Sequence, residues 1–386
     1  MLHATTATFD DETATPTPWP ASVIEELAAV FTERAADHDG NGSFVAENYD
    51  LLRDRRLLAA GVPEELGGGG ASHAELCEIL RGIGRACGST ALALSMHTHL
   101  VAATVWKHRH GKPGEALLRR VALEDLVLVS TGAADWLGSN GTLTRVDGGY
   151  RFTAQKICCS GSPVGDLMIT SGALEDGPNG PEVLHFAVPF AAEGVEIIED
   201  WDVLGMRGTG SHTCRLTDVF VPDEAIALRR PREGWHPAWS VVLTVAMPLI
   251  MSAYLGVTEQ ACDIARTFAV RKGADQPLAP LGAMETKLTA AKIAVESMVE
   301  LACDYDFEPS LERANDMLMR KSIATRAMLD AVDAAMEAGG GAMFARAVGF
   351  ERCFRDVQGC RYHPLAEGKQ REFTARVLLG LDPVTS

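Results

Sequence analysis

Residues 201–222 read WDVLGMRGTGSHTCRLTDVFVP. The second half of this stretch, CRLTDVFVP, is rich in β-branched and aromatic residues. Four more runs of this kind stand between positions 126 and 189, namely LVLVS, YRFTA, LMITS and LHFAVP. Gly, Pro and Asp separate them at the spacing of a small all-β domain, and Gly148-Gly149 is a strong turn signal. The middle of the chain is therefore predicted to be a β domain.

Helical patterns flank this region on both sides. In the N-terminal part, Asn48 is the expected N-cap of a helix, and Ser72 with Glu75 has the spacing of a capping box. A long apolar helix is expected from Gly88 onward. Helices return from about Trp235, where residues 239–255 contain Pro248 and several small residues and read as a buried core helix.

These patterns divide the chain into four parts. We expect a disordered tail over residues 1–21, an N-terminal α-helical domain over 22–122, a middle β domain over 123–233 and a C-terminal helical bundle over 234–386. The predicted fold class is α+β and multidomain, with a barrel-like β domain and a four-helix bundle.

Composition and simple motifs exclude several classes of protein. With 35 basic and 52 acidic residues the net charge is −17, which argues against nucleic acid or an anionic membrane as a partner. Nine irregularly spaced cysteines fit reduced thiols in a cytoplasmic protein. No apolar run approaches the ~18 residues of a membrane span. No metal site is expected, because His97 and His99 stand two apart and diverge on a helix.

Four phrases, taken in order, resemble the acyl-CoA dehydrogenase superfamily. They are GVPEELGGGGASHAELCEILRGIGRACGSTALALSMHTHL, then STGAADW with DGGYRFTAQKICCSGSP, then residues 201–222, and finally GGGAMFARAVGFERCFRD. The resemblance covers roughly residues 22 to 382 and has the same helical, β, helical layout. It implies a flavin-dependent oxidoreductase with FAD held between the β domain and the bundle of a homotetramer or homodimer.

The resemblance also implies which residues meet the flavin. Val129, Ser130 and Thr131 match the strand that contacts the isoalloxazine ring. Cys158 and Ser160 fall where the family has a tryptophan and a threonine against the ring. Ser160 can still donate a hydrogen bond, whereas Cys158 cannot stack as an indole would.

At the adenosine end the resemblance is less complete. Arg271 matches the arginine that reaches a neighbouring subunit's pyrophosphate, for which a guanidinium fork is suited. Gly339 and Gly340 match a glycine turn close to the cofactor. The glutamine expected three residues before that turn is Met336. FAD is the expected cofactor, with FMN or a reduced flavin supplied by a reductase as the alternative.

The residue expected to act as the catalytic base is missing. Relatives use a glutamate that removes the α-proton while hydride passes to the flavin, but its position here is Pro364, and the alternative position falls near Ala246. Three replacements are candidates for catalysis: Glu367, His363 and His97.

Three functions therefore compete. The first is α,β-oxidation of an acyl thioester linked to CoA or to a carrier protein, with Glu367 as base and an electron-transfer flavoprotein as acceptor. The second is a monooxygenase that uses reduced flavin and O2 on a small molecule, with a histidine at the reaction centre and a flavin reductase as partner. The third is a non-catalytic flavin-binding relative. The sequence ranks them in this order.

Overall fold

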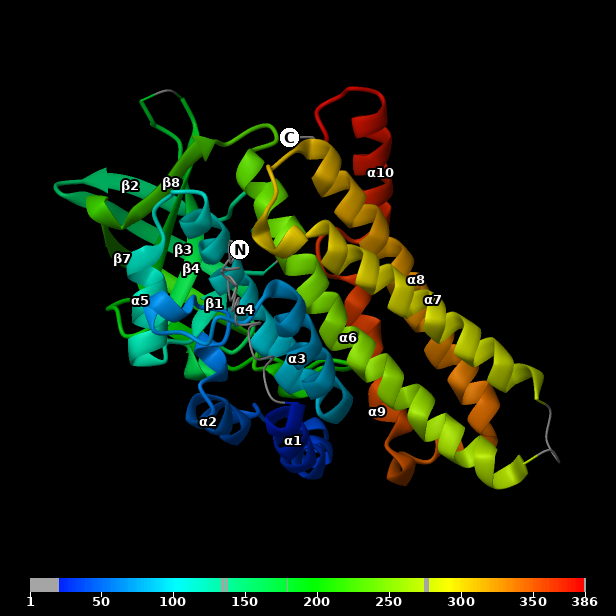
Figure 1. Ribbon diagram of the computed structural model, residues 1–386. Helices are drawn as coiled ribbons and strands as arrows, with labels where there is room; N and C mark the ends of the chain where they lie inside the picture. The colour runs from blue at the N-terminus through cyan, green and yellow to red at the C-terminus, as the bar shows by residue number, and fades with distance from the viewer. Residues whose placement is uncertain (1–20, 133–134, 136–137, 179, 274–277, 385–386) are drawn as a thin grey trace, which may run out of the picture.

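The computed structural model describes residues 21–132, 135, 138–178, 180–273 and 278–384 (Figure 1). The expected tail lies outside these residues except for Ala21, the first residue of α1. A helical part, a sheet and a second helical part follow one another along the chain, as the sequence predicts.

The N-terminal part is made of five α-helices: α1 (Ala21–Asn41), α2 (Ala46–Asp54), α3 (His73–Ala86), α4 (Gly88–Arg109) and α5 (Glu115–Glu124). The capping box is confirmed, because the Ser72 hydroxyl accepts from Glu75 N–H and the Glu75 carboxylate accepts from Ser72 N–H at 2.8 Å. The predicted N-cap at Asn48 is wrong. The α2 helix begins two residues earlier, and Asn48 is buried inside it, where its amide donates to Thr90 Oγ1 at 2.8 Å.

The middle part is a mixed sheet of eight strands: β1 (Leu128–Ser130), β2 (Thr142–Val146), β3 (Gly149–Cys159), β4 (Leu167–Leu174), β5 (Glu182–Pro189), β6 (Val195–Ile198), β7 (His212–Pro222) and β8 (Ile226–Pro231). Their order is β6-β7-β3-β2-β4-β5-β8, and β1 runs parallel to β4. The turn at Gly148-Gly149 is confirmed, since it joins β2 to β3 in an antiparallel hairpin.

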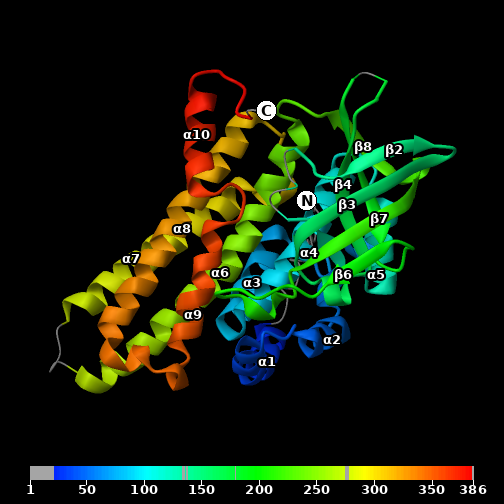
Figure 2. The same cartoon turned by 180° about the vertical axis from the view of Figure 1, so that it is seen from behind.

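Five helices form the C-terminal part: α6 (Pro237–Lys272), α7 (Ala279–Leu301), α8 (Leu311–Gly339), α9 (Phe350–Val357) and α10 (Glu367–Leu378). Figures 1 and 2 show α6, α7 and α8 side by side as long rods. On its other side, α6 packs against α3 and α4 of the N-terminal part. The α6 helix is long and apolar enough to cross a membrane, but 94% of its most apolar window is buried inside the protein. It is a core helix, as the sequence predicts.

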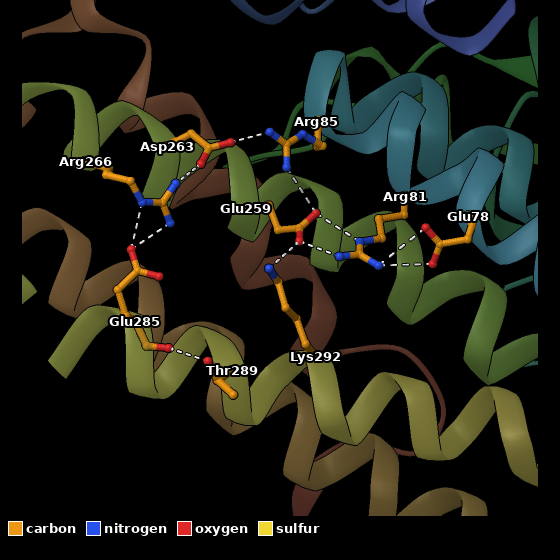
Figure 3. A network of polar contacts seen from close by, with 9 residues as sticks. All are labelled: Glu78, Arg81, Arg85, Glu259, Asp263, Arg266, Glu285, Thr289 and Lys292. Carbon is orange, nitrogen blue, oxygen red and sulfur yellow. Dashed lines mark hydrogen bonds and ion pairs between the residues drawn. The ribbon is translucent and has the colours of Figure 1, made fainter. Parts of the chain in front are cut away.

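A network of ion pairs connects α3 of the N-terminal part to the bundle (Figure 3). Glu259 of α6 is buried, and its carboxylate accepts from Arg81 of α3 at 2.6 and 3.0 Å and from Lys292 of α7 at 3.1 Å. Arg85 of α3 adds a contact at 3.4 Å. Because one carboxylate meets cations from two other helices, it holds α3, α6 and α7 in a fixed arrangement.

Candidate active site

A cavity of about 500 Å³ lies where the three parts of the chain meet. The sheet supplies one wall, α4 and α6 supply another, and the segment from α9 to α10 closes a third side. Its volume is within the range of small-molecule sites, roughly 300–1,000 Å³. Most of its lining is apolar, with Leu92 and Met96 from α4 and Leu243, Met247 and Ile250 from α6.

Hydroxyl and backbone groups form the wall that comes from the sheet. Ser130, Thr131, Cys158 and Ser160 all line the cavity, so the structure brings together four of the residues that the sequence assigned to the flavin. Ser160 Oγ lies 2.7 Å from Ser211 Oγ, which also lines the cavity. Val129 is fully buried in the core behind this wall and does not line the cavity.

The chain approaches itself closely behind this wall. A Cβ on Gly132 would lie 2.4 Å from the carbonyl oxygen of Ile157, so only glycine fits there. The pairing of β3 with β7 shifts in register between Lys156 and Cys159, and Cys158 within this shift has a φ of 59°. Such bulges re-aim side chains next to active sites. A wall that carries several hydroxyls suits a flavin ring, whose electronics such polar contacts tune.

A buried ion pair supports the loop that carries Thr131. Lys156 is fully buried, and its ammonium donates to Asp135 Oδ1 at 2.5 Å and to the carbonyls of Asn140 and Ser171 at 2.7 and 2.8 Å. The hydroxyl of Thr131 donates to the other carboxylate oxygen of Asp135 at 2.7 Å. Because every donor of the ammonium has an acceptor, the pair fixes this edge of the cavity.

No residue that lines the cavity carries a carboxylate, among the part of the chain that the structure describes. Pro364 and Ala246, which occupy the two positions expected for the base, both line the cavity and cannot accept a proton. Glu367 is the first residue of α10, is exposed, pairs with Arg371 and does not line the cavity. The structure therefore gives no support to Glu367 as the base.

Two histidines of α4 have different surroundings. His97 Nε2–H donates to the carbonyl of Leu58 at 2.8 Å, and its Nδ1 accepts from the N–H of Leu128 at 3.0 Å. Both ring nitrogens are thus used inside the fold and His97 does not line the cavity, so the structure gives no support to His97 as a catalytic residue. His99 lines the cavity instead. Its Nδ1–H donates to the carbonyl of Ser95 at 3.1 Å, which leaves Nε2 as an acceptor.

His363 lines the cavity from the segment between α9 and α10. Its Nε2 lies 2.8 Å from the hydroxyl of Tyr254, a buried residue of α6. Burial lowers the pKa of His363 to about 3, and the charge of Lys321 and the nearby His99 add to this shift. Burial likewise lowers the pKa of His99 to about 4. Both imidazoles are therefore neutral at physiological pH.

Arg271 and the glycine turn lie at the far end of the bundle. Arg271 is the penultimate residue of α6, 25 positions after Ala246, which corresponds to roughly 37 Å along the helix. Lys272 donates to the carbonyl of Gly339 at 3.0 Å, so the arginine and the turn are neighbours. Neither the arginine nor the turn lines the cavity. Their proposed role stays a prediction that requires a second subunit.

The sequence alone did not single out His99 or Tyr254. Leu92, Met96 and His99 stand at positions i, i+4 and i+7 of one helix, so a common face could have been read from their spacing. Which face of α4 meets the cavity depends on how the helix packs, and no spacing shows that. Tyr254 is one of many residues in an apolar run, and nothing in that run marks it.

Comparison with known proteins places the chain in a family. The acyl-CoA dehydrogenase N-terminal domain matches residues 21–122, and the acyl-CoA dehydrogenase C-terminal domain matches residues 252–367. Together these ranges cover more than half of the chain. The protein belongs to the acyl-CoA dehydrogenase superfamily, as the sequence predicts.

Among its relatives are a putative acyl-CoA dehydrogenase and several monooxygenases. The chain is 27% identical to the putative acyl-CoA dehydrogenase YdbM of Bacillus subtilis, over 88% of this chain and 91% of that one. It is 28% identical to a dibenzothiophene monooxygenase of Mycolicibacterium goodii, over 89% and 90%. A structure of KijD3 in complex with FMN and a dTDP-amino-keto sugar superposes with a TM-score of 0.84 at 26% identity, covering 96% of both chains.

These comparisons confirm the fold and the broad class, a flavin-dependent oxidoreductase. They confirm the flavin in general terms and do not single out FAD. Between the competing activities they favour the monooxygenase, which the sequence ranked second, over thioester oxidation, which it ranked first. The missing carboxylate points in the same direction.

Proposed function

We propose that this protein is a monooxygenase that uses reduced FMN and O2 to oxygenate a small, uncharged and largely apolar molecule. The observation that carries the proposal is a cavity lined by neutral imidazoles and apolar side chains, with no carboxylate among its described residues. Abstraction of an α-proton requires a base within hydrogen-bond reach, and this cavity offers no carboxylate for that task.

When bound, reduced flavin supplies two electrons to O2, so that one oxygen atom enters the substrate and the other leaves as water with the two flavin hydrogens. The residues of this chain would orient the ring, offer hydrogen bonds and exclude water. Ser130 and Ser160 orient the ring, while His363 and His99 offer a neutral N–H donor and a neutral acceptor to the oxygen-bearing side. Leu92, Met96 and Leu243 exclude water.

The apolar lining supports the substrate class. Arg355 is the one charged side chain at the cavity among the described residues, and its guanidinium is already paired with Asp39 at 2.5 Å and Glu351 at 2.6 Å. An anionic substrate would have to compete with these carboxylates. An uncharged, largely apolar molecule faces no such competition, and most of its contacts would be with Leu, Met, Ile and Val side chains.

The residues of this chain favour FMN over FAD. Arg271 stands about 25 Å along α6 from Tyr254, which lines the cavity, and Met336 replaces the glutamine of relatives. We propose a separate flavin reductase as partner, a homotetramer or homodimer as the assembly and the cytoplasm as the location. A relative from Pseudomonas putida is named probable FMNH2-dependent monooxygenase SfnC, and this name supports the first of these.

The decisive experiment separates the two half-reactions. The protein is loaded with FMN without oxygen, and acyl-CoAs of several chain lengths are added while the absorbance of oxidised flavin is followed. We expect no bleaching. The flavin is then reduced with light, with EDTA as the electron donor, oxygen is admitted, and we expect the absorbance to return more slowly than for free FMN. Bleaching by a thioester would overturn the proposal in favour of a dehydrogenase.

A variant tests the role of the cavity histidine. We expect His363→Asn to bind FMN as the wild type does but to lose on the order of 10²-fold in oxygenation, the usual scale for removing a hydrogen-bond donor that stabilises developing negative charge. Indole and dibenzothiophene serve as uncharged aromatic probes, with incorporation of one labelled oxygen atom measured by mass spectrometry. His108 lies in the last turn of α4. The variant His108→Asn is the matched control and should leave the rate unchanged.

A further inference from the structure

Tyr254 and His363 form a pair at the edge of the cavity. The tyrosine is fully buried in α6, and its hydroxyl lies 2.8 Å from His363 Nε2. The two rings are 5.3 Å apart with their planes tilted by 58°. The backbone of Gly359 lies close to the hydroxyl, since a Cβ there would be 2.5 Å from the oxygen. The phenol is therefore held in one position.

Donation by the hydroxyl of Tyr254 is the favoured direction of this hydrogen bond. Burial raises the pKa of the phenol, and the neighbouring Cys360 and Asp356 raise it further, so the group keeps its proton. Within the described residues its oxygen has one hydrogen-bond partner, the imidazole of His363. A buried O–H that donated nowhere would carry the cost of an unsatisfied donor. Donation to Nε2 avoids that cost.

The direction of this bond decides where the imidazole carries its own proton. The ring is neutral because it is buried and because Lys321, whose ammonium donates to the carbonyl of Leu365 at 3.1 Å, stands nearby. A neutral imidazole has one N–H and one acceptor nitrogen. Since Nε2 accepts from the tyrosine, the proton is on Nδ1, and Nδ1 has no partner among the described residues although the ring lines the cavity.

We propose that Tyr254 is a positioning residue that fixes His363 as the Nδ1–H tautomer and turns this N–H toward the cavity. The imidazole then acts there as a hydrogen-bond donor and not as a base. This inference rests on the proposed oxygenase function for its purpose, but the tautomer itself does not depend on it. On α4, His99 has its Nε2 free to accept, so it offers a hydrogen-bond acceptor where His363 offers a donor.

Histidine 15N NMR on the protein without flavin tests the tautomer directly. The signal of His363 is identified by its loss in His363→Gln. We expect the wild type to show a protonated Nδ1 and an unprotonated Nε2. In Tyr254→Phe we expect a mixture of both tautomers, because the donor that selected one of them is gone. A protonated Nε2 in the wild type, or an unchanged spectrum in the variant, would overturn the proposal.

A second readout uses the FMN-loaded enzyme. We expect Tyr254→Phe to leave the Kd for FMN unchanged and to speed the return of oxidised-flavin absorbance on adding oxygen by about two- to tenfold, the worth of one hydrogen bond. Tyr305→Phe is the matched control, since that hydroxyl is buried without a partner among the described residues. An equal effect of both variants would show a packing role only and would reject the positioning role.

The two readouts separate the two proposals. If the NMR result is as expected but no flavin binds, the proposed function fails and the tautomer assignment stands. If flavin binds and oxygen reacts slowly while the tautomer is Nε2–H, the function stands and the role of Tyr254 fails.

Discussion

Tyr254 and Glu259 are buried polar residues five positions apart on α6, and their surroundings differ. Five residues turn a helix by about 500°, so the two side chains leave the helix about 140° apart. Glu259 faces α3 and α7 and meets cations on both (Figure 3). Tyr254 faces the cavity and meets one neutral imidazole.

The difference shows how a buried polar group can serve structure or chemistry. The carboxylate of Glu259 is surrounded by charge, so its hydrogen-bonding capacity is used within the fold. The Tyr254–His363 pair keeps one ring nitrogen available for a ligand. Glu259 therefore stabilises the assembly of the helices, whereas the pair is available for function. Substitutions at Glu259, at the cavity histidines and at two residues outside the cavity test this contrast.

Removal of the Glu259 carboxylate should be the most damaging change. In Glu259→Ala the half-buried Arg81 and Lys292 and the exposed Arg85 lose their common partner, and loss of one member of a buried pair costs about 3–5 kcal/mol. Urea unfolding followed by circular dichroism measures the change in the free energy of unfolding. The control is Glu124→Ala, which breaks the exposed pair with Arg120 and should have no measurable effect. A loss no larger than that of the control would contradict the structural role.

The two histidines of α4 should separate stability from activity. His97→Ala leaves the N–H of Leu128 and the carbonyl of Leu58 without partners, and we expect a loss of about 2–4 kcal/mol in the free energy of unfolding. His99→Ala should cost less stability but more oxygenation rate, because His99 lines the cavity. Thermal melts and the labelled-oxygen assay on both variants give the answer. The reverse pattern would exchange the two assignments.

The buried imidazoles make stability depend on pH. The pKa of His363 is about 3 and those of His97 and His99 are about 4 when folded, against about 6.5 when unfolded. The unfolded chain thus binds more protons, so their contribution is present above pH 6.5 and is lost as pH falls toward 4. The slope is up to about 1.4 kcal/mol per pH unit for each group. His363→Asn should reduce the slope measured by urea unfolding between pH 6.5 and 4, and an unchanged slope would contradict a neutral ring.

Arg271 tests whether the far end of the bundle takes part in cofactor binding. If it holds a pyrophosphate across a subunit interface, Arg271→Ala should weaken FAD binding by roughly tenfold and leave FMN binding unchanged. Fluorescence titration with each flavin measures both constants. Equal retention of the two flavins would remove Arg271 from the cofactor site.

The smallest effect is expected at Glu367. Its carboxylate is exposed and pairs with Arg371 on the same helix, away from the cavity. Glu367→Gln should therefore change neither the oxygenation rate nor the anaerobic behaviour with acyl-CoAs. A large loss of activity would restore Glu367 as a catalytic residue and revive the dehydrogenase hypothesis.

Local signals in the sequence predicted local structure well. The Ser72–Glu75 spacing predicted a capping box, and Gly148-Gly149 predicted a hairpin turn, because both are formed by residues that are neighbours in the chain. Asn48 shows the limit of such signals. Its amide is used for a contact with Thr90, a residue 42 positions away, and this contact outweighs its preference for a cap.

The sequence by itself determined the order of helical and β regions, the family and the absence of the usual glutamate at position 364. These follow from residue types at fixed spacing along the chain. Only the tertiary structure decided that His99 and not His97 reaches the cavity, that Glu367 stays outside it and that Tyr254 meets His363. These contacts join α4, α6 and the segment before α10, and the side chains that meet are fixed by how the helices pack and not by their order in the chain.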